Sequence, residues 1–150
     1  MTKISQIYAA LETVIETELP TYRKIPNPYD SSANANVILR QGYGIVAGAG
    51  SNTNRVLGCE MSIARDFGVI LTKQIAKTEH DADGRTNQEK ALFEDQYLLV
   101  KSLEKNPSLT GTAAKVGFVG DNGIEVLDLE TGRYFVLVSQ FNVEYFENLT

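Results

Sequence analysis

The sequence of 150 residues has one cysteine and one histidine, and this scarcity excludes two kinds of site. Cys59 has no second cysteine in the chain with which to form a disulfide, and His80 cannot build a metal site of several histidines. Basic residues are also in the minority. The 14 Lys and Arg are outnumbered by 19 Asp and Glu, giving a net charge of −5, which argues against a protein that grips nucleic acid by overall charge.

Long apolar runs are missing as well. The longest uncharged stretch, between Arg40 and Arg55, is rich in Gly and Asn, and acidic residues from Glu12 onward interrupt any signal-peptide core. We therefore expect no membrane segment and an intracellular protein. With 43% hydrophobic and 22% charged residues, the composition is that of one globular domain spanning residues 1–150.

The first part of the chain predicts a helix followed by an extended arm. Apolar residues from Ile4 to Ile15 recur at three- and four-residue spacing, Thr2 or Ser5 can cap the helix, and Leu19-Pro20 ends it after Glu18. Residues 20–35 hold three of the four prolines and predict a long extended loop or arm. A strand over Asn36–Val46 and a flexible turn over 48–54 are expected next.

Seven of the eight odd positions from Leu57 to Leu71 are apolar, and most of the even positions up to Thr72 are small or polar. This alternation predicts one unusually long strand, in preference to two strands with a break at Arg65-Asp66. A second helix is expected after an acidic loop, with Thr86 and Glu89 as its capping box and Asn106-Pro107 at its end. Three strands are predicted to follow, at 114–119, 124–129 and 133–145, with turns at 121–123 and 130–132. The fold class is therefore α+β, a twisted and mostly antiparallel sheet flanked by two helices, in the order α-β-β-α-β-β-β.

Two motifs resemble ligand sites, but the residues around each motif do not fit such a site. Gly42–Ala47 matches a relaxed dinucleotide-binding pattern, yet no helix is predicted to begin there to meet a pyrophosphate, so we interpret it as strand. The loop with Glu79, Asp81 and Asp83 resembles a calcium loop, but Lys90 stands where a bidentate Glu is required. We expect no catalytic residue, no metal and no cofactor; His80 is interpreted as a surface residue and Cys59 as a buried thiol.

The arm carries aromatic and cationic residues of the types favoured at protein interfaces, unless it folds back over its own core. From the arm and the long strand, the predicted subunit or partner interface consists of Tyr22, Arg23, Lys24, Tyr29, Arg65 and Phe67.

The element order, the size and the C-terminal segment Arg133–Tyr145 resemble tail-completion proteins of tailed bacteriophages, and more narrowly the lambda-like tail terminator family. The resemblance covers most of the chain and is one of pattern, without a diagnostic motif. The long arm at 20–35 departs from it.

The resemblance implies a structural virion protein rather than an enzyme. It would be a subunit of a homo-oligomeric ring, expected to be a hexamer, that caps the tail tube and joins it to the head and neck. The implied partners are further copies of the chain, the tail tube protein and the head–neck connector proteins, with DNA passing through the lumen without specific binding. The protein would assemble in the host cytoplasm and reside in the tail or neck of the virion.

Two alternatives stay open on the sequence. One is another neck protein, such as a head-closure or connector subunit. The other is a small cytoplasmic α+β enzyme or ligand-binding domain, with its site in the Gly42–Gly50 segment or in the Glu79–Asp83 loop.

Overall fold

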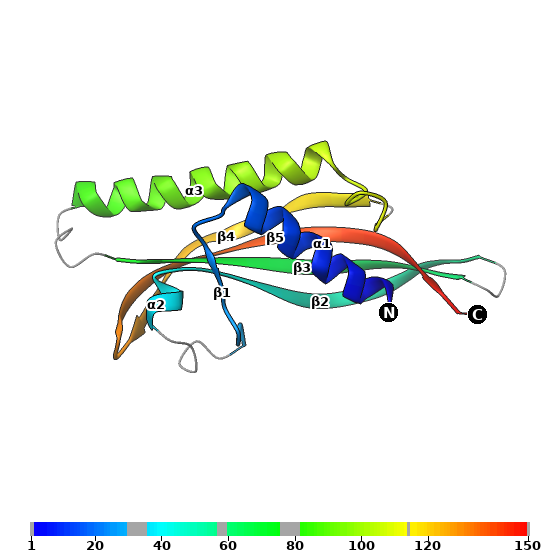
Figure 1. Ribbon diagram of the computed structural model, residues 1–150, viewed down its shortest axis with the longest axis horizontal. Coiled ribbons are helices and arrows are strands. Elements are labelled where there is room, and N and C mark those ends of the chain that lie inside the picture. Colours follow the sequence, from blue (N-terminus) through cyan, green and yellow to red (C-terminus); the bar gives the residue numbers. More distant parts are fainter. Residues whose placement is uncertain (1, 30–35, 57–59, 76–81, 114, 150) are drawn as a thin grey trace.

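The computed structural model describes residues 2–29, 36–56, 60–75, 82–113 and 115–149. Its five-stranded sheet has the strand order β1-β2-β3-β5-β4. The elements along the chain are α1 (Lys3–Glu18), β1 (Arg23–Lys24), α2 (Asn36–Leu39), β2 (Gln41–Val56), β3 (Glu60–Gln74), α3 (Ala82–Lys105), β4 (Lys115–Leu129) and β5 (Gly132–Asn148). The predicted α+β class is confirmed (Figure 1).

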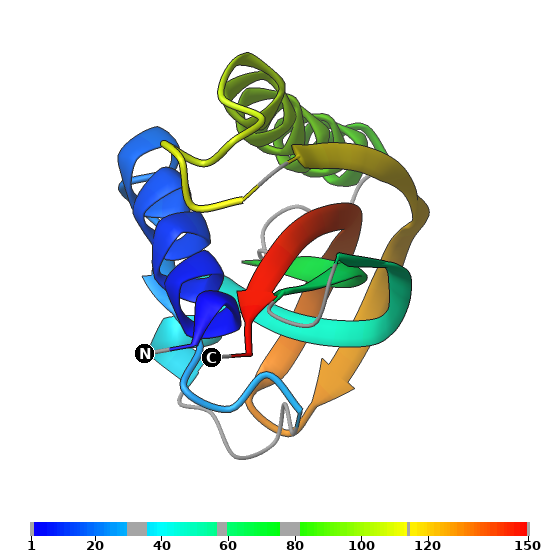
Figure 2. The same cartoon turned by 90° about the vertical axis from the view of Figure 1, so that its right-hand side faces the viewer.

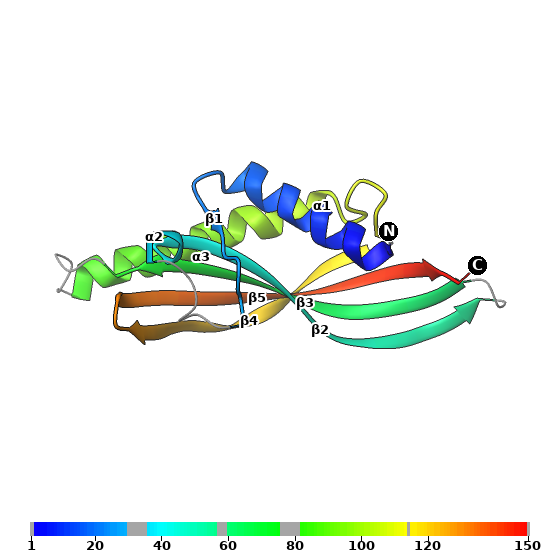
Figure 3. The same cartoon turned by 60° about the horizontal axis from the view of Figure 1, so that its bottom comes forward.

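Two antiparallel hairpins, β2–β3 and β4–β5, are joined by antiparallel pairing of β3 with β5, and the short β1 pairs in parallel with β2. The helices α1 and α3 lie on the same face of this sheet (Figure 3). The sheet is strongly twisted, so its strands fan out when the molecule is viewed end-on (Figure 2). The β2–β3 hairpin projects past the start of α1 (Figure 1).

The helix α1 forms where the periodicity predicts it. The Thr2 hydroxyl accepts a hydrogen bond from the Ser5 N–H, which caps the first turn, and the helix ends at Glu18 before Leu19. Its buried stripe consists of Ile7, Leu11 and Ile15. This stripe packs on the inner face of the sheet, where the main core lies.

The alternation in β3 and β5 sends large side chains into that core. Phe67, Val69 and Leu71 of β3 are fully buried, and so are Leu137 and Phe141 of β5. β3 pairs along its whole length, Glu60 to Gln74, with β5. The predicted long strand is thus confirmed for the described residues, but it is the central strand of the sheet and exposes no edge; Leu57 and Cys59 lie outside the described residues.

A smaller core lies on the opposite face of the sheet, under the arm and α2. It contains the buried residues Ile25, Leu39 and Tyr134. The Thr72 hydroxyl fixes this corner, since it accepts from the Gly42 N–H and donates to the Leu39 carbonyl. The arm over residues 20–29 therefore folds against its own subunit.

Two strand predictions early in the chain are wrong in their bounds. Residues 36–39 of the predicted strand form the single turn α2, and the strand β2 begins at Gln41. The predicted turn at 48–54 is part of β2, because its small and polar residues are accommodated by register shifts between Ala47 and Gly50 and between Asn52 and Asn54.

Similar corrections apply later in the chain. The helix α3 begins at Ala82, so Thr86 and Glu89 lie inside it and form no capping box, while its predicted end before Asn106 is confirmed. The turn at 130–132 is confirmed, but the predicted strands 114–119 and 124–129 form the one strand β4. Asp121 and Gly123 lie at an irregularity within β4, where the Gly123 N–H donates to Asp121 Oδ1 over 2.7 Å.

Candidate functional site

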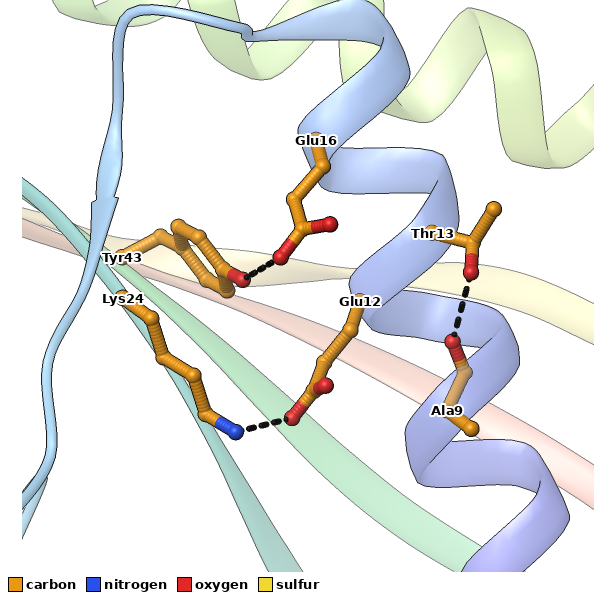
Figure 4. Close-up of polar contacts among 6 residues, drawn as sticks. All are labelled: Ala9, Glu12, Thr13, Glu16, Lys24 and Tyr43. Atoms are coloured by element: carbon orange, nitrogen blue, oxygen red, sulfur yellow. Dashed lines mark hydrogen bonds and ion pairs between the residues drawn. The ribbon is translucent and has the colours of Figure 1, made fainter.

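Polar contacts join the arm and β2 to the helix α1. Lys24 Nζ of β1 lies 2.7 Å from Glu12 Oε1 of α1, and the Tyr43 hydroxyl of β2 donates to Glu16 Oε1 over 2.8 Å (Figure 4). Burial, and then the hydrogen bond that the Tyr43 hydroxyl donates to the Glu16 carboxylate, raises the pKa of Tyr43 above its ordinary value. These contacts hold the arm at the β2 side of the sheet.

Two of the predicted interface residues belong to the interior instead. Phe67 is 0% exposed and Tyr22 is 6% exposed, so neither side chain is on the surface where a neighbouring subunit could contact it. Phe67 meets the Tyr8 ring edge-on, with the ring centroids 5.4 Å apart. Their assignment to the interface is corrected. The alternation that suggests Phe67 as an interface residue belongs to the subunit's own core, and Tyr22 is buried because the arm folds back over that core.

Arg65 braces the projecting β2–β3 hairpin. Its guanidinium donates to the Tyr145 hydroxyl over 3.1 Å and to the Gly48 carbonyl over 3.0 Å. A Cβ at Gly50 would lie 2.7 Å from the guanidinium carbon of Arg65. The glycine therefore leaves space for the Arg65 side chain. The contacts of Arg65 within the subunit make it a structural brace.

Arg23, Lys24 and Tyr29 remain at the surface as the interface prediction requires. Tyr29 is 77% exposed, and its N–H donates to Asn27 Oδ1. Arg23 is exposed on β1, at one edge of the sheet, and Lys24 next to it is held by Glu12.

β4 forms the opposite edge of the sheet, and its outer side differs between its two ends. Near its start, the Val116 N–H donates to the Pro107 carbonyl over 2.7 Å and the Phe118 N–H to Glu104 Oε1 over 3.3 Å. Towards its end no strand or loop of the described residues pairs with the outward side of β4. Exposed backbone groups of this kind are a template for another strand.

Large apolar side chains are exposed beside this edge. Val119 of β4 is 66% exposed and Val126 is 49% exposed. On α3, Phe93 and Tyr97 are exposed and share a flank with Glu104, the residue that bonds to β4. Val126 lies opposite Phe135, on the face of the sheet that α1 and α3 cover, whereas Val119 borders a hollow lined by Gly117, Asn142 and Glu144 on the other face. The exposed apolar residues of the β4 side, Phe93, Tyr97, Val119 and Val126, are therefore separate groups.

The sequence reasoning missed the exposed apolar residues of the β4 side, including the aromatic pair Phe93 and Tyr97. The available signal is the i, i+4 pair of aromatic residues on α3, which lies off the buried stripe of Leu92, Gln96, Leu99 and Leu103.

The motifs set aside on the sequence can now be placed. Gly42–Ala47 lies within β2, so the strand interpretation is confirmed. A Cβ at Gly42 would lie 2.7 Å from the Ile38 carbonyl oxygen, which shows that this glycine serves a close approach of α2 to the sheet. The nearby hollow between Tyr8, Lys24 and Tyr43 has a volume of about 180 Å³, below the roughly 300 Å³ at which pockets for small organic ligands begin.

Cys59, Glu79, His80 and Asp81 lie outside the described residues, and Asp83 is placed only by its backbone in the first turn of α3. Within the described ranges, no group of three or more His, Cys, Asp or Glu side chains is placed to hold a metal ion. No helix in this part of the chain is both long and apolar enough to cross a membrane.

Comparison of the chain with models of known protein families and with curated proteins yields no match.

Proposed function

We propose that this chain is a structural ring subunit of the tail or neck of a tailed bacteriophage, a tail terminator that caps the tail tube and joins it to the head. The observation that carries the proposal is the open end of the β4 edge, where Val126 is exposed. Unpaired strand groups beside an exposed apolar side chain are stabilised when another protein covers them.

The arrangement of the layers also supports a ring. The helices α1 and α3 lie on one face of the sheet (Figure 3), and β1 and β4 are the two edges of the strand order. A subunit whose opposite sides contact identical neighbours assembles head to tail, and such contacts form a closed ring when the rotation closes. We propose a closed ring and not an open filament because the element order resembles that of tail terminators.

The charge of the chain suits a ring around DNA. A net charge of −5 gives no general attraction for phosphates, so DNA would pass through the lumen without being held. The proposed partners are therefore the chain itself, the tail tube protein and the head–neck connector proteins.

The test is to measure the mass of the purified protein by light scattering and native mass spectrometry, and then to add tail tubes assembled from the cognate tube protein. We expect a closed ring, of about six copies by the resemblance, that electron microscopy finds at tube ends. A protein that stays monomeric and does not bind tube ends would contradict the proposal. Rings that bind the head connector but ignore the tube would instead identify a head-closure or connector subunit.

A further inference from the structure

The strand pairing places two oppositely charged residues at matching positions on the two edges of the sheet. One row of residues crosses all five strands, each residue paired with the next one: Arg23, Gly42, Thr72, Val136 and Glu125. Residues opposite one another in a sheet lie on the same face. Arg23 at the β1 edge and Glu125 at the β4 edge are thus level with each other, on one face, and both are exposed.

Both edges present backbone groups at this level. At the β1 edge, the Ile25 N–H donates to the Tyr43 carbonyl, so the alternation turns the N–H and C=O of Lys24 away from β2. At the β4 edge, the hairpin closes with Leu129 opposite Gly132. The N–H and C=O of Leu129 point to β5, and so do those of every second residue before it, Leu127 and Glu125. The N–H and C=O of the residues between these, Val126 and Ile124, therefore point away from β5.

The charges of the two edges are complementary. The end of β4 and its turn carry Glu125, Asp128 and Glu130, of which Asp128 is paired with Arg133 over 2.7 Å. The β1 edge carries Arg23 and Lys24. Pairing of two β4 edges across a two-fold axis would bring the acidic residues of both copies together, which is unfavourable. The β4 edge therefore suits a basic strand.

The strand directions allow the pairing between copies of like orientation. β1 runs parallel to β2, and β2, β3, β5 and β4 alternate in direction, so β1 runs opposite to β4. A second copy reached by rotation about a ring axis keeps this relation, and its β1 would then meet β4 as an antiparallel neighbour.

We propose that the end of the β4 edge binds the β1 segment of the next copy of this chain, as an antiparallel strand with Glu125 opposite Arg23 of that copy. The contact deepens the proposed ring function and rests on it. It continues the sheet from subunit to subunit and covers the exposed side chain of Val126 with a second copy.

The test uses charge reversal at the two ends of the row. Arg23→Glu and Glu125→Arg are each expected to weaken self-association about tenfold, because each puts like charges opposite one another. The double variant restores the pair in reversed order and is expected to associate within about threefold of the original protein. Lys90→Glu and Glu94→Arg are controls with the same charge changes at exposed positions of α3.

Association is measured by light scattering and sedimentation at low and high salt, with circular dichroism to confirm folding. Single variants that form rings as well as the controls do, or a double variant that is no better than the singles, would overturn the β1–β4 contact. In either case rings of the unmodified protein that cap tail tubes would leave the proposed function standing. An unmodified protein that neither forms rings nor caps tubes would overturn both, and a defined dimer would point to a two-fold contact and overturn this one.

Discussion

The Tyr22 hydroxyl donates a hydrogen bond of 2.5 Å to Asp95 Oδ2, and this contact joins the arm to the middle of α3. Tyr22 follows α1 by four residues and is almost fully buried. A residue that the sequence suggested as a surface anchor therefore stabilises the subunit from within. The arm is part of the folded domain at this point, and its removal would open the core.

Replacing Tyr22 by Phe is expected to lower the free energy of unfolding by roughly 1.5–3 kcal/mol, because a buried hydrogen bond to a carboxylate is lost. The measurement is urea unfolding followed by circular dichroism. Tyr97→Phe is the matched control, since this tyrosine is exposed, and it is expected to change stability by less than about 0.5 kcal/mol. Equal stability of the two variants would mean that the Asp95 contact contributes nothing.

The buried hydroxyls of Tyr22 and Tyr43 predict a loss of stability in alkaline solution. Burial first, and then the hydrogen-bonded carboxylates of Asp95 and Glu16, raise the pKa of Tyr22 and of Tyr43 above the ordinary value of 10.0. Above pH 10 the unfolded chain therefore loses these protons while the folded protein keeps them, so the folded state binds more protons and its stability falls as pH rises. The stabilisation is fully present below pH 10.

The measurement is the urea midpoint between pH 8 and pH 11. We expect a decline beginning near pH 10 that is smaller in Tyr22→Phe and Tyr43→Phe, because each variant lacks one of the perturbed groups. A decline of unchanged size in both variants would assign the alkaline sensitivity to other groups.

Gly42→Ala is expected to destabilise the protein by about 1–3 kcal/mol, because the new methyl group would lie 2.7 Å from the Ile38 carbonyl oxygen and 2.9 Å from Ile25 Cγ1. Gly117→Ala in β4 is the control, since a Cβ there meets nothing within 4 Å. Thermal unfolding compares the two. If Gly42→Ala is as stable as Gly117→Ala, the arm and α2 do not rest on the sheet at this point.

The elements with strong local patterns are the ones that the sequence predicts. The helix α1 has a continuous apolar stripe and a clear stop at Leu19-Pro20, and both of its ends are correct. The long strand β3 follows from its alternation, because a strand with one face in the core must repeat every two residues.

The errors arise where local signals are decided by pairing with distant residues. Gly48 to Asn54 and Asp121 to Gly123 have the composition of turns, yet β3 and β5 run beside them and draw them into long strands with irregular register. The burial of Tyr22 likewise depends on Asp95, which is 73 residues away in the chain. The level of Arg23 with Glu125 depends on four strand pairings at once, which no local pattern contains.

The last prediction tests the direction of the backbone groups at the β4 edge by proline substitution. The N–H of Val126 points away from β5, so Val126→Pro removes no hydrogen bond within the subunit, and proline is tolerated at such edge positions. Leu127→Pro is the matched variant one residue along. Its N–H points to β5 opposite Tyr134, and its side chain packs on the smaller core.

We expect Val126→Pro to keep its free energy of unfolding within about 1 kcal/mol of the original protein. Leu127→Pro is expected to lose about 3 kcal/mol or more, because it breaks a ladder hydrogen bond and removes a packed side chain. Urea unfolding at a concentration where both variants are monomeric makes the comparison. A larger loss in Val126→Pro than in Leu127→Pro would mean that the alternation along β4 is reversed. The outward groups would then belong to Leu127, and the β4 edge could not present Val126 to another strand.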